Sequence, residues 1–206
     1  MNPQNMIHAL PGMGANRRMY PAPWLGLPDF AAHDWTPYSG EKSLADIAQS
    51  TCNARGICDG DSLVGSSLGG MVACEITKIR KIKTLYLIGS ATRKEEINAV
   101  LSTLHPLIQI APIDWLRFSA GKIPDEFTQM FAEAEAPFLR AMCSAIFDWQ
   151  GLVDSSTQVY RIHGKKDFVI PLPASVDLVI DGGHLISITH AVQCVEFIKA
   201  NFDLPH

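Results

Sequence analysis

The sequence lacks the features that mark a disulfide scaffold, a zinc site or a membrane protein. Its five cysteines are an odd number, with no CxxC pair and no spacing typical of metal ligands. No apolar stretch approaches the length that crosses a membrane, and no basic segment followed by an apolar run stands near residue 1. We therefore expect a reduced, cytoplasmic protein that holds no metal and has no membrane partner.

The chain also has no large excess of positive or negative charge. The formal net charge is −4, charged residues make up 18% of the chain, and lysine and arginine gather only at Lys78, Arg80, Lys81 and Lys83. This small group is typical of the solvated end of a helix, so nucleic acid is not an expected partner. Hydrophobic residues make up 47% of the 206 residues, enough for the core of one domain spanning 1–206.

What the sequence does contain is an alternation of short apolar runs with amphipathic segments. Strands are predicted at 6–10, 30–35, 62–64, 83–89, 157–162 and 176–180. Helices are predicted after Ser43, as an N-cap with Asp46 reaching back, over 71–79, and over 186–201. Such alternation predicts an α/β fold with a mostly parallel sheet of about six strands flanked by helices, whose ligands sit at the carboxyl ends of the strands.

The segment Gly65-Ser66-Ser67-Leu68-Gly69 lies between a predicted strand and a predicted helix. A serine on such a sharp turn has an exposed Oγ, so Ser67 is the candidate nucleophile. The alternative is a glycine-rich turn in which Ser66 or Ser67 only caps the next helix. Gly12-Met13-Gly14 follows another strand and is either a simple turn or a loop that directs the Met13 N–H into a site.

Two further groups follow predicted strands, and they are the types that a nucleophilic serine needs. Asp167 comes after the strand at 157–162, and His184 comes after the strand at 176–180. A serine hydroxyl requires a base, and the base requires an acid that fixes its tautomer. Asp148 and Asp154 are alternative acids, although neither follows a convincing strand. Cys74 and the other histidines, among them His8, His105, His163 and His190, are expected to be structural.

Residues 93–150 interrupt the alternation with a series of short helical stripes. Most of their apolar side chains are expected to pack in the core, and a minority are candidates for contacts with an acyl group. These candidates for substrate binding are Trp115, Phe118, Phe127, Met130, Phe131 and Met142.

Over nearly its whole length the chain resembles the alpha/beta-hydrolase fold superfamily. The resemblance lies in residues 10–14, 65–70, 163–167 and 182–184. It implies a small helical lid at about 93–150, a Ser67–His184–Asp167 triad, and an oxyanion hole formed by the N–H groups of Met13 and Leu68. It also implies hydrolysis of a carboxylic ester or thioester through an acyl-serine, with no organic cofactor.

The same types of site residue are compatible with other functions. An acyltransferase or a cofactor-free lyase would use the same serine and histidine, and a non-catalytic receptor on this fold would bind a small apolar molecule. The expected partner is a small-molecule acyl ester. Only about five residues, 171–175, are left to cross between the last two strands, so one side of the sheet is expected to be thinly covered. By the same resemblance, the antiparallel edge that the first two strands of the full fold build is expected to be absent. A second copy could form a homodimer at either exposed flank.

Overall fold

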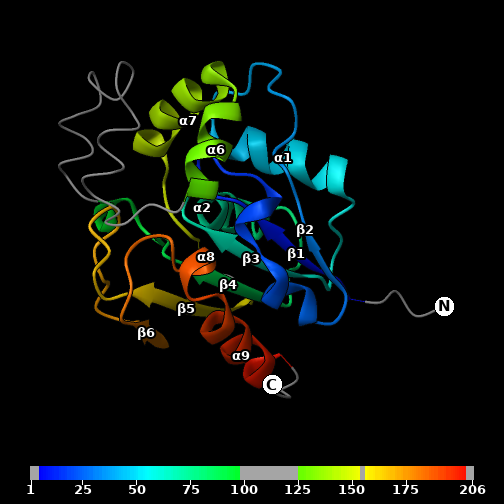
Figure 1. The fold of residues 1–206 in the computed structure, drawn as a ribbon. Helices are drawn as coiled ribbons and strands as arrows, with labels where there is room; N and C mark the ends of the chain where they lie inside the picture. The colour runs from blue at the N-terminus through cyan, green and yellow to red at the C-terminus, as the bar shows by residue number, and fades with distance from the viewer. Residues whose placement is uncertain (1–4, 98–124, 154–155, 203–206) are drawn as a thin grey trace.

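The computed structural model describes residues 5–97, 125–153 and 156–202. Its central feature is a six-stranded sheet, parallel throughout, in the order β2-β1-β3-β4-β5-β6 (Figure 1). The strands are β1 (Ile7–Leu10), β2 (Phe30–Ala32), β3 (Ser62–Ser66), β4 (Thr84–Ile88), β5 (Gln158–Gly164) and β6 (Leu178–Ile180). The predicted α/β fold with about six strands is therefore confirmed.

Helices cover both faces of the sheet. The α-helices are α1 (Leu44–Arg55), α2 (Leu68–Ile76), α6 (Asp125–Glu133), α7 (Ala136–Asp148), α8 (Ile186–Thr189) and α9 (Ala191–Asn201), and the 3-10 helices are η1 (Arg17–Met19), η2 (Ala22–Gly26) and η3 (Lys94–Glu96). In Figure 1, α1 and α2 lie on one face and α8 and α9 on the other, while α6 and α7 lie beyond the carboxyl ends of the strands. Because α6 and α7 come between β4 and β5 in the chain, we call them the inserted helices.

The two cores follow from the alternation of side chains along each strand. In β4, Leu85 and Leu87 pack against α1 and α2, whereas Tyr86 and Ile88 pack toward η2, α8 and α9. All five residues of β3 and of β4 are buried. A strand buried on both faces belongs to the middle of a parallel sheet, so the chain segments that follow β3 and β4 are held firmly at its carboxyl edge.

Helix α1 has the ends that its sequence predicts. The Ser43 Oγ accepts from the Asp46 N–H at 3.1 Å, and the Asp46 carboxylate accepts from the Ser43 N–H at 3.0 Å. This reciprocal capping box satisfies two donors at the start of the helix. Gly56 ends the helix with φ +65°, which glycine adopts without steric cost.

Several element boundaries differ from those predicted. Strand β2 stops at Ala32 rather than continuing to residue 35, and α2 begins at Leu68, three residues earlier than predicted. The last helix is two helices, because His190 leaves the helical region with φ −130° and ψ 35°. Its Nδ1 lies 2.8 Å from Thr189 Oγ1, a local contact that accompanies the break.

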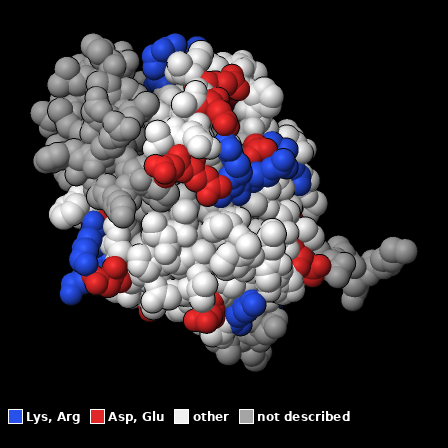
Figure 2. Space-filling model, viewed as in Figure 1, with Lys and Arg blue, Asp and Glu red and all other residues white. Residues whose placement is uncertain are grey.

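On the face shown in Figure 2, acidic and basic side chains lie next to one another and do not form a large area of one sign. The ion pairs of the described residues include Arg18 of η1 with Glu133 of α6, and Arg17 with Asp34 at 3.7 Å. Among the described residues, no helix has both the length and the apolar character needed to span a bilayer.

Candidate active site

Ser67 stands alone between the end of β3 and the start of α2, in an unusual backbone conformation. Its φ of 52° and ψ of −119° are sparsely populated for a residue with a side chain. Hydrogen bonds hold it there, since the Ser67 N–H donates to Ile88 O at 3.0 Å and Ser90 Oγ donates to Ser67 O at 2.7 Å. The strand-to-helix turn predicted from the sequence is therefore present, and β4 supports it.

The glycines around Ser67 are required by close packing of backbone on backbone. A Cβ on Gly65 would lie 2.4 Å from the Cα of Gly70, and a Cβ on Gly69 would lie 2.2 Å from the carbonyl oxygen of Leu10. The turn is thus pressed against the end of β1. Ser67 makes no side-chain hydrogen bond to the backbone of α2, so the alternative in which its hydroxyl caps that helix does not hold.

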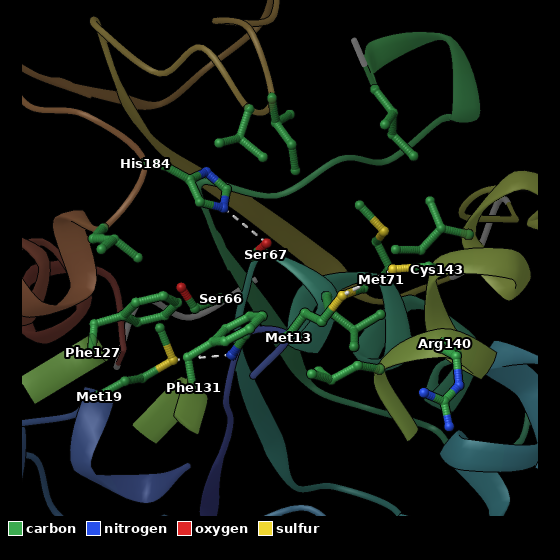
Figure 3. Close-up of a pocket in the computed structure, with 18 of the residues that line it drawn as sticks. Met13, Met19, Ser66, Ser67, Met71, Phe127, Phe131, Arg140, Cys143 and His184 are labelled. Carbon is green, nitrogen blue, oxygen red and sulfur yellow. Dashed lines mark hydrogen bonds between the residues drawn. The ribbon is translucent and has the colours of Figure 1, made fainter. Parts of the chain in front are cut away.

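The structure brings the three side chains predicted from strand ends into one hydrogen-bonded chain. Ser67 Oγ lies 2.9 Å from His184 Nε2, and His184 Nδ1 lies 2.8 Å from Asp167 Oδ2 (Figure 3 shows the first contact). Because Nδ1 faces a carboxylate, we assign the ring proton to Nδ1. Nε2 is then free to accept the proton of the serine hydroxyl.

Asp167 is buried, yet its carboxylate has a full set of donors. Oδ1 accepts from the N–H groups of Val169 and Ile170, each at 2.9 Å, while His163 Nε2 contacts Ile170 O at 2.8 Å and lies 3.4 Å from Oδ2. Burial by itself would raise the pKa of Asp167. The neighbouring His184, with hydrogen bonds from His163, from His184 and from the Ile170 backbone, instead holds that pKa well below its usual range. Asp167 is therefore ionised at neutral pH.

Met13 and Leu68, the two residues expected to supply oxyanion donors, both line the cavity in front of Ser67. Leu68 is the first residue of α2, where backbone N–H groups have no carbonyl partner within the helix. The N–H of Gly12, a neighbouring candidate, instead donates to Met19 Sδ at 3.0 Å. Figure 3 shows that contact at the wall of the cavity.

The cavity has a volume of about 180 Å³ and is lined mainly by apolar side chains. Its lining comprises residues near β1 and the Ser67 turn, the inserted helices, and the loops before Ile170 and after His184. Of the predicted substrate-binding residues, Phe127 and Phe131 line it. Met130 and Met142 are buried in the two cores and are not among the residues that line this cavity. Trp115 and Phe118 lie outside the described residues.

Several lining residues were not predicted from the sequence. They are Met19, Met71, Ile97, Leu139, Cys143 and Ile146. Their positions in amphipathic stripes are the same as those of core residues, so the sequence carries no signal that separates the two roles. Ser90, which holds the Ser67 carbonyl, was also missed, because it is paired across 23 residues of chain.

The alternative carriers of the chemistry lie elsewhere. Asp148 is exposed at the end of α7, and Asp154 lies outside the described residues. Cys74 is fully buried, and burial raises the pKa of its thiol to about 12, so it is a packing residue. His8 contacts Asp61 and His33. Among the residues that the structure describes, no group of three or more His, Cys, Asp and Glu side chains is arranged to hold a metal ion.

The chain is similar to known proteins in its structure, whereas the sequence comparisons find no match. No family model matches the sequence, and no curated protein matches it. A hydrolase from Oleispira antarctica is 14% identical over 99% of this chain and 93% of its own, with a TM-score of 0.79. A lipase-esterase related protein from Clostridium acetobutylicum is 16% identical over 95% of this chain and 93% of its own, at 0.76. A thermophilic esterase from Thermogutta terrifontis is 18% identical over 97% of this chain and 89% of its own, at 0.72.

The chain has the alpha/beta-hydrolase fold. An alpha/beta-hydrolase carries its nucleophile on the turn from a strand to a helix, which is the position of Ser67. Asp167 and His184 lie in the loops after β5 and β6, and the described residues 165–177 between these two strands contain no helix. The N–H groups of Val169 and Ile170, in this short connection, hold the Asp167 carboxylate, and that carboxylate in turn contacts His184 Nδ1.

Proposed function

We propose that this alpha/beta-hydrolase is a serine hydrolase that cleaves a carboxylic ester or thioester. The observation that carries the proposal is the chain of hydrogen bonds from Ser67 Oγ to His184 Nε2 and from His184 Nδ1 to Asp167, opening on an apolar cavity. In the first step, Ser67 Oγ bonds to the carbonyl carbon while its proton moves to His184 Nε2. The ionised Asp167 stabilises the imidazolium that results.

The second half of the reaction uses the same groups. When the tetrahedral intermediate collapses, the bond to the leaving alkoxide or thiolate breaks, and His184 returns the proton to the leaving group. A water molecule then attacks the acyl-serine, giving its proton to His184, and the acid is released as Ser67 recovers its proton. The N–H groups of Met13 and Leu68 are proposed to bind the negative oxygen, at about 3 to 4 kcal/mol for each donor.

The cavity is suited to an uncharged acyl group of small to medium size. Its volume of about 180 Å³ exceeds the roughly 150 Å³ of an apolar cavity that accommodates benzene. Arg140 lines the cavity, but in Figure 3 its guanidinium points away from Ser67. We therefore expect turnover to be greatest for acyl groups of about four to eight carbons. A series of p-nitrophenyl esters of increasing chain length measures this preference.

Labelling with a serine-directed fluorophosphonate tests the nucleophile directly. We expect the wild type to be labelled and Ser67→Ala to remain unlabelled, because the probe forms its bond with the serine that the base activates. Ser66→Ala is the matched control, since it removes the adjacent hydroxyl, whose Oγ lies 3.3 Å from Ser187 Oγ rather than against His184. This variant should keep the label, and mass spectrometry should locate it on Ser67.

Ester turnover gives the second measurement. Ser67→Ala and His184→Ala should each lower kcat by at least about a thousandfold. An unlabelled wild type, or Ser67→Ala labelled as well as the wild type, contradicts the proposal. The first of these outcomes would favour a receptor that binds a small apolar molecule in the same cavity.

A further inference from the structure

The loop after β1 is held by several of its own peptide groups. The carbonyl of Leu10 accepts from the Tyr20 hydroxyl, and the N–H of Gly12 donates to Met19 Sδ. The carbonyl of Gly12 accepts from the N–H of Ala15 at 3.2 Å, which closes a tight turn with Gly14 at φ +69°. A positive φ at the third position is what a type II turn requires, so glycine fits there.

A second donor reaches the Gly12 carbonyl from a distant part of the chain. The indole Nε1–H of Trp35 donates to Gly12 O at 3.1 Å, across 23 residues of sequence. Trp35 is itself fixed on two sides. Its ring lies 5.4 Å from that of Phe138 on α7, centroid to centroid, and the Arg55 guanidinium of α1 donates to the carbonyl just before it, that of Asp34, at 2.7 Å.

The direction of the Gly12 carbonyl determines the direction of the Met13 N–H. The two belong to one planar peptide group, and no peptide bond among the described residues is cis. In a trans peptide the C=O and the N–H point in opposite directions. A donor that holds Gly12 O on one side therefore keeps the Met13 N–H turned to the other side.

Gly12 also lies beside Ser67. A Cβ placed on Gly12 would lie 3.5 Å from the Cβ of Ser67, so the peptide that Trp35 holds begins next to the proposed nucleophile. Gly12 has no side chain of its own to restrict rotation of the peptide that follows it. Its orientation thus depends on the groups that hold its carbonyl, which are Ala15 N–H and Trp35 Nε1–H.

We propose that Trp35 is a positioning residue for the oxyanion hole, which keeps the Met13 N–H directed at the oxygen of the tetrahedral intermediate. This inference rests on the proposed function and adds a residue from outside the four segments that carry the chemistry. Trp35 acts through the Gly12–Met13 peptide and does not line the cavity. Its contact with Phe138 also links the orientation of that peptide to the packing of α7.

The test replaces the indole donor while retaining an aromatic ring. Trp35→Phe should lower kcat about tenfold, less than loss of a whole oxyanion donor, because Ala15 N–H still holds the Gly12 carbonyl. KM should change by less than about twofold, since the hole binds the intermediate more strongly than the substrate. The affinity for a trifluoromethyl ketone, which forms an oxyanion on Ser67, should fall by the same factor as kcat.

Trp149→Phe is the matched control. It removes an indole N–H that donates to Glu75 Oε1 at 2.8 Å, in a contact that does not involve the loop after β1. Its kcat and its affinity for the ketone should stay within about twofold of the wild type. If Trp35→Phe fails to fold, replacement of Trp35 by 3-benzothienylalanine, which has sulfur in place of the N–H, keeps the ring shape for the same measurements.

The outcomes separate this inference from the proposed function. An unchanged kcat and ketone affinity in Trp35→Phe, beside a wild type whose turnover depends on Ser67, overturns the role of Trp35 alone. A loss that is confined to KM, or that Trp149→Phe shares, overturns it as well. A wild type without Ser67-dependent turnover overturns the proposed function first.

Discussion

Gly69 offers a direct test of how tightly the Ser67 turn is packed against the end of β1. The substitution Gly69→Ala adds one methyl group in the first turn of α2. That Cβ would lie 2.2 Å from the carbonyl oxygen of Leu10 and 2.5 Å from that of Pro11. Both contacts are with backbone, which cannot rotate aside as a flexible side chain can, so α2 and the loop after β1 must separate.

The expected loss of stability follows from the overlap of this Cβ with the two carbonyl oxygens. Ordinary van der Waals contact begins near 3.4 Å, so a shift of about an ångström is required. Overpacking of a filled interior costs about 1 to 3 kcal/mol, and we expect the upper part of that range because the neighbours are backbone. For a chain of this size, each kcal/mol lowers Tm by about 2 to 4 °C, so the expected decrease is about 5 to 10 °C. Displacement of the Gly12–Met13 peptide should also lower kcat, by up to about a hundredfold.

Calorimetry and ester turnover measure the two effects. Gly26→Ala is the matched control, because its Cβ would meet only the flexible Nζ of Lys199, at 3.4 Å. This variant should keep Tm within about 2 °C of the wild type. A Gly69→Ala protein with unchanged Tm and kcat would show that the Ser67 turn and the loop after β1 are not in the close contact described.

Two further predictions concern titratable groups. Asp167→Asn should lower kcat by about 10³- to 10⁴-fold, because the amide N–H₂ favours the wrong tautomer of His184. The near-UV circular dichroism should stay unchanged, since the amide oxygen can still accept from the N–H groups of Val169 and Ile170. A loss of kcat below about tenfold would contradict this role of Asp167. Burial, followed by the influence of His8 and Arg55, lowers the pKa of His33 from 6.5 to about 4 despite the opposing Asp34, and burial lowers the pKa of the adjacent His8 although Asp61 opposes it. The unfolded chain therefore takes up protons first as the pH falls from about 6.5 to 4, and stability should decrease over that window. Urea unfolding at pH 7.5 and at pH 5 should show a smaller decrease for His33→Gln than for the wild type, and equal decreases would exclude His33 as a source.

The positions of Ser67, Asp167 and His184 could be predicted because each depends on a local pattern joined to one rule of topology. Each residue follows an apolar run, and parallel strands in an α/β sheet bring their carboxyl ends to the same edge. The fold followed from the same alternation. Neither inference needed any knowledge of which side chains touch.

The cavity could not be predicted, because a helical stripe shows which side of a helix is buried but not what covers it. Phe127, Met130 and Phe131 all belong to one buried face of α6, yet only the two phenylalanines reach the cavity. Trp35 gave no signal for a similar reason. Its role depends on a hydrogen bond to Gly12 across 23 residues, which no local spacing encodes.

Because α6 and α7 are inserted between two strands, the lining of the cavity and the geometry of the sheet depend on different parts of the chain. These two helices come between β4 and β5, which are neighbours in the sheet and are fixed in register by five pairs of residues, from Thr84 with Gln158 to Ile88 with Ile162. The entropy of closing a loop grows only slowly with its length, so this segment can change in size or sequence without moving the strands that it connects. Under the proposed function, acyl preference can therefore diverge, or be engineered, while Ser67, Asp167 and His184 stay anchored to an unchanged sheet.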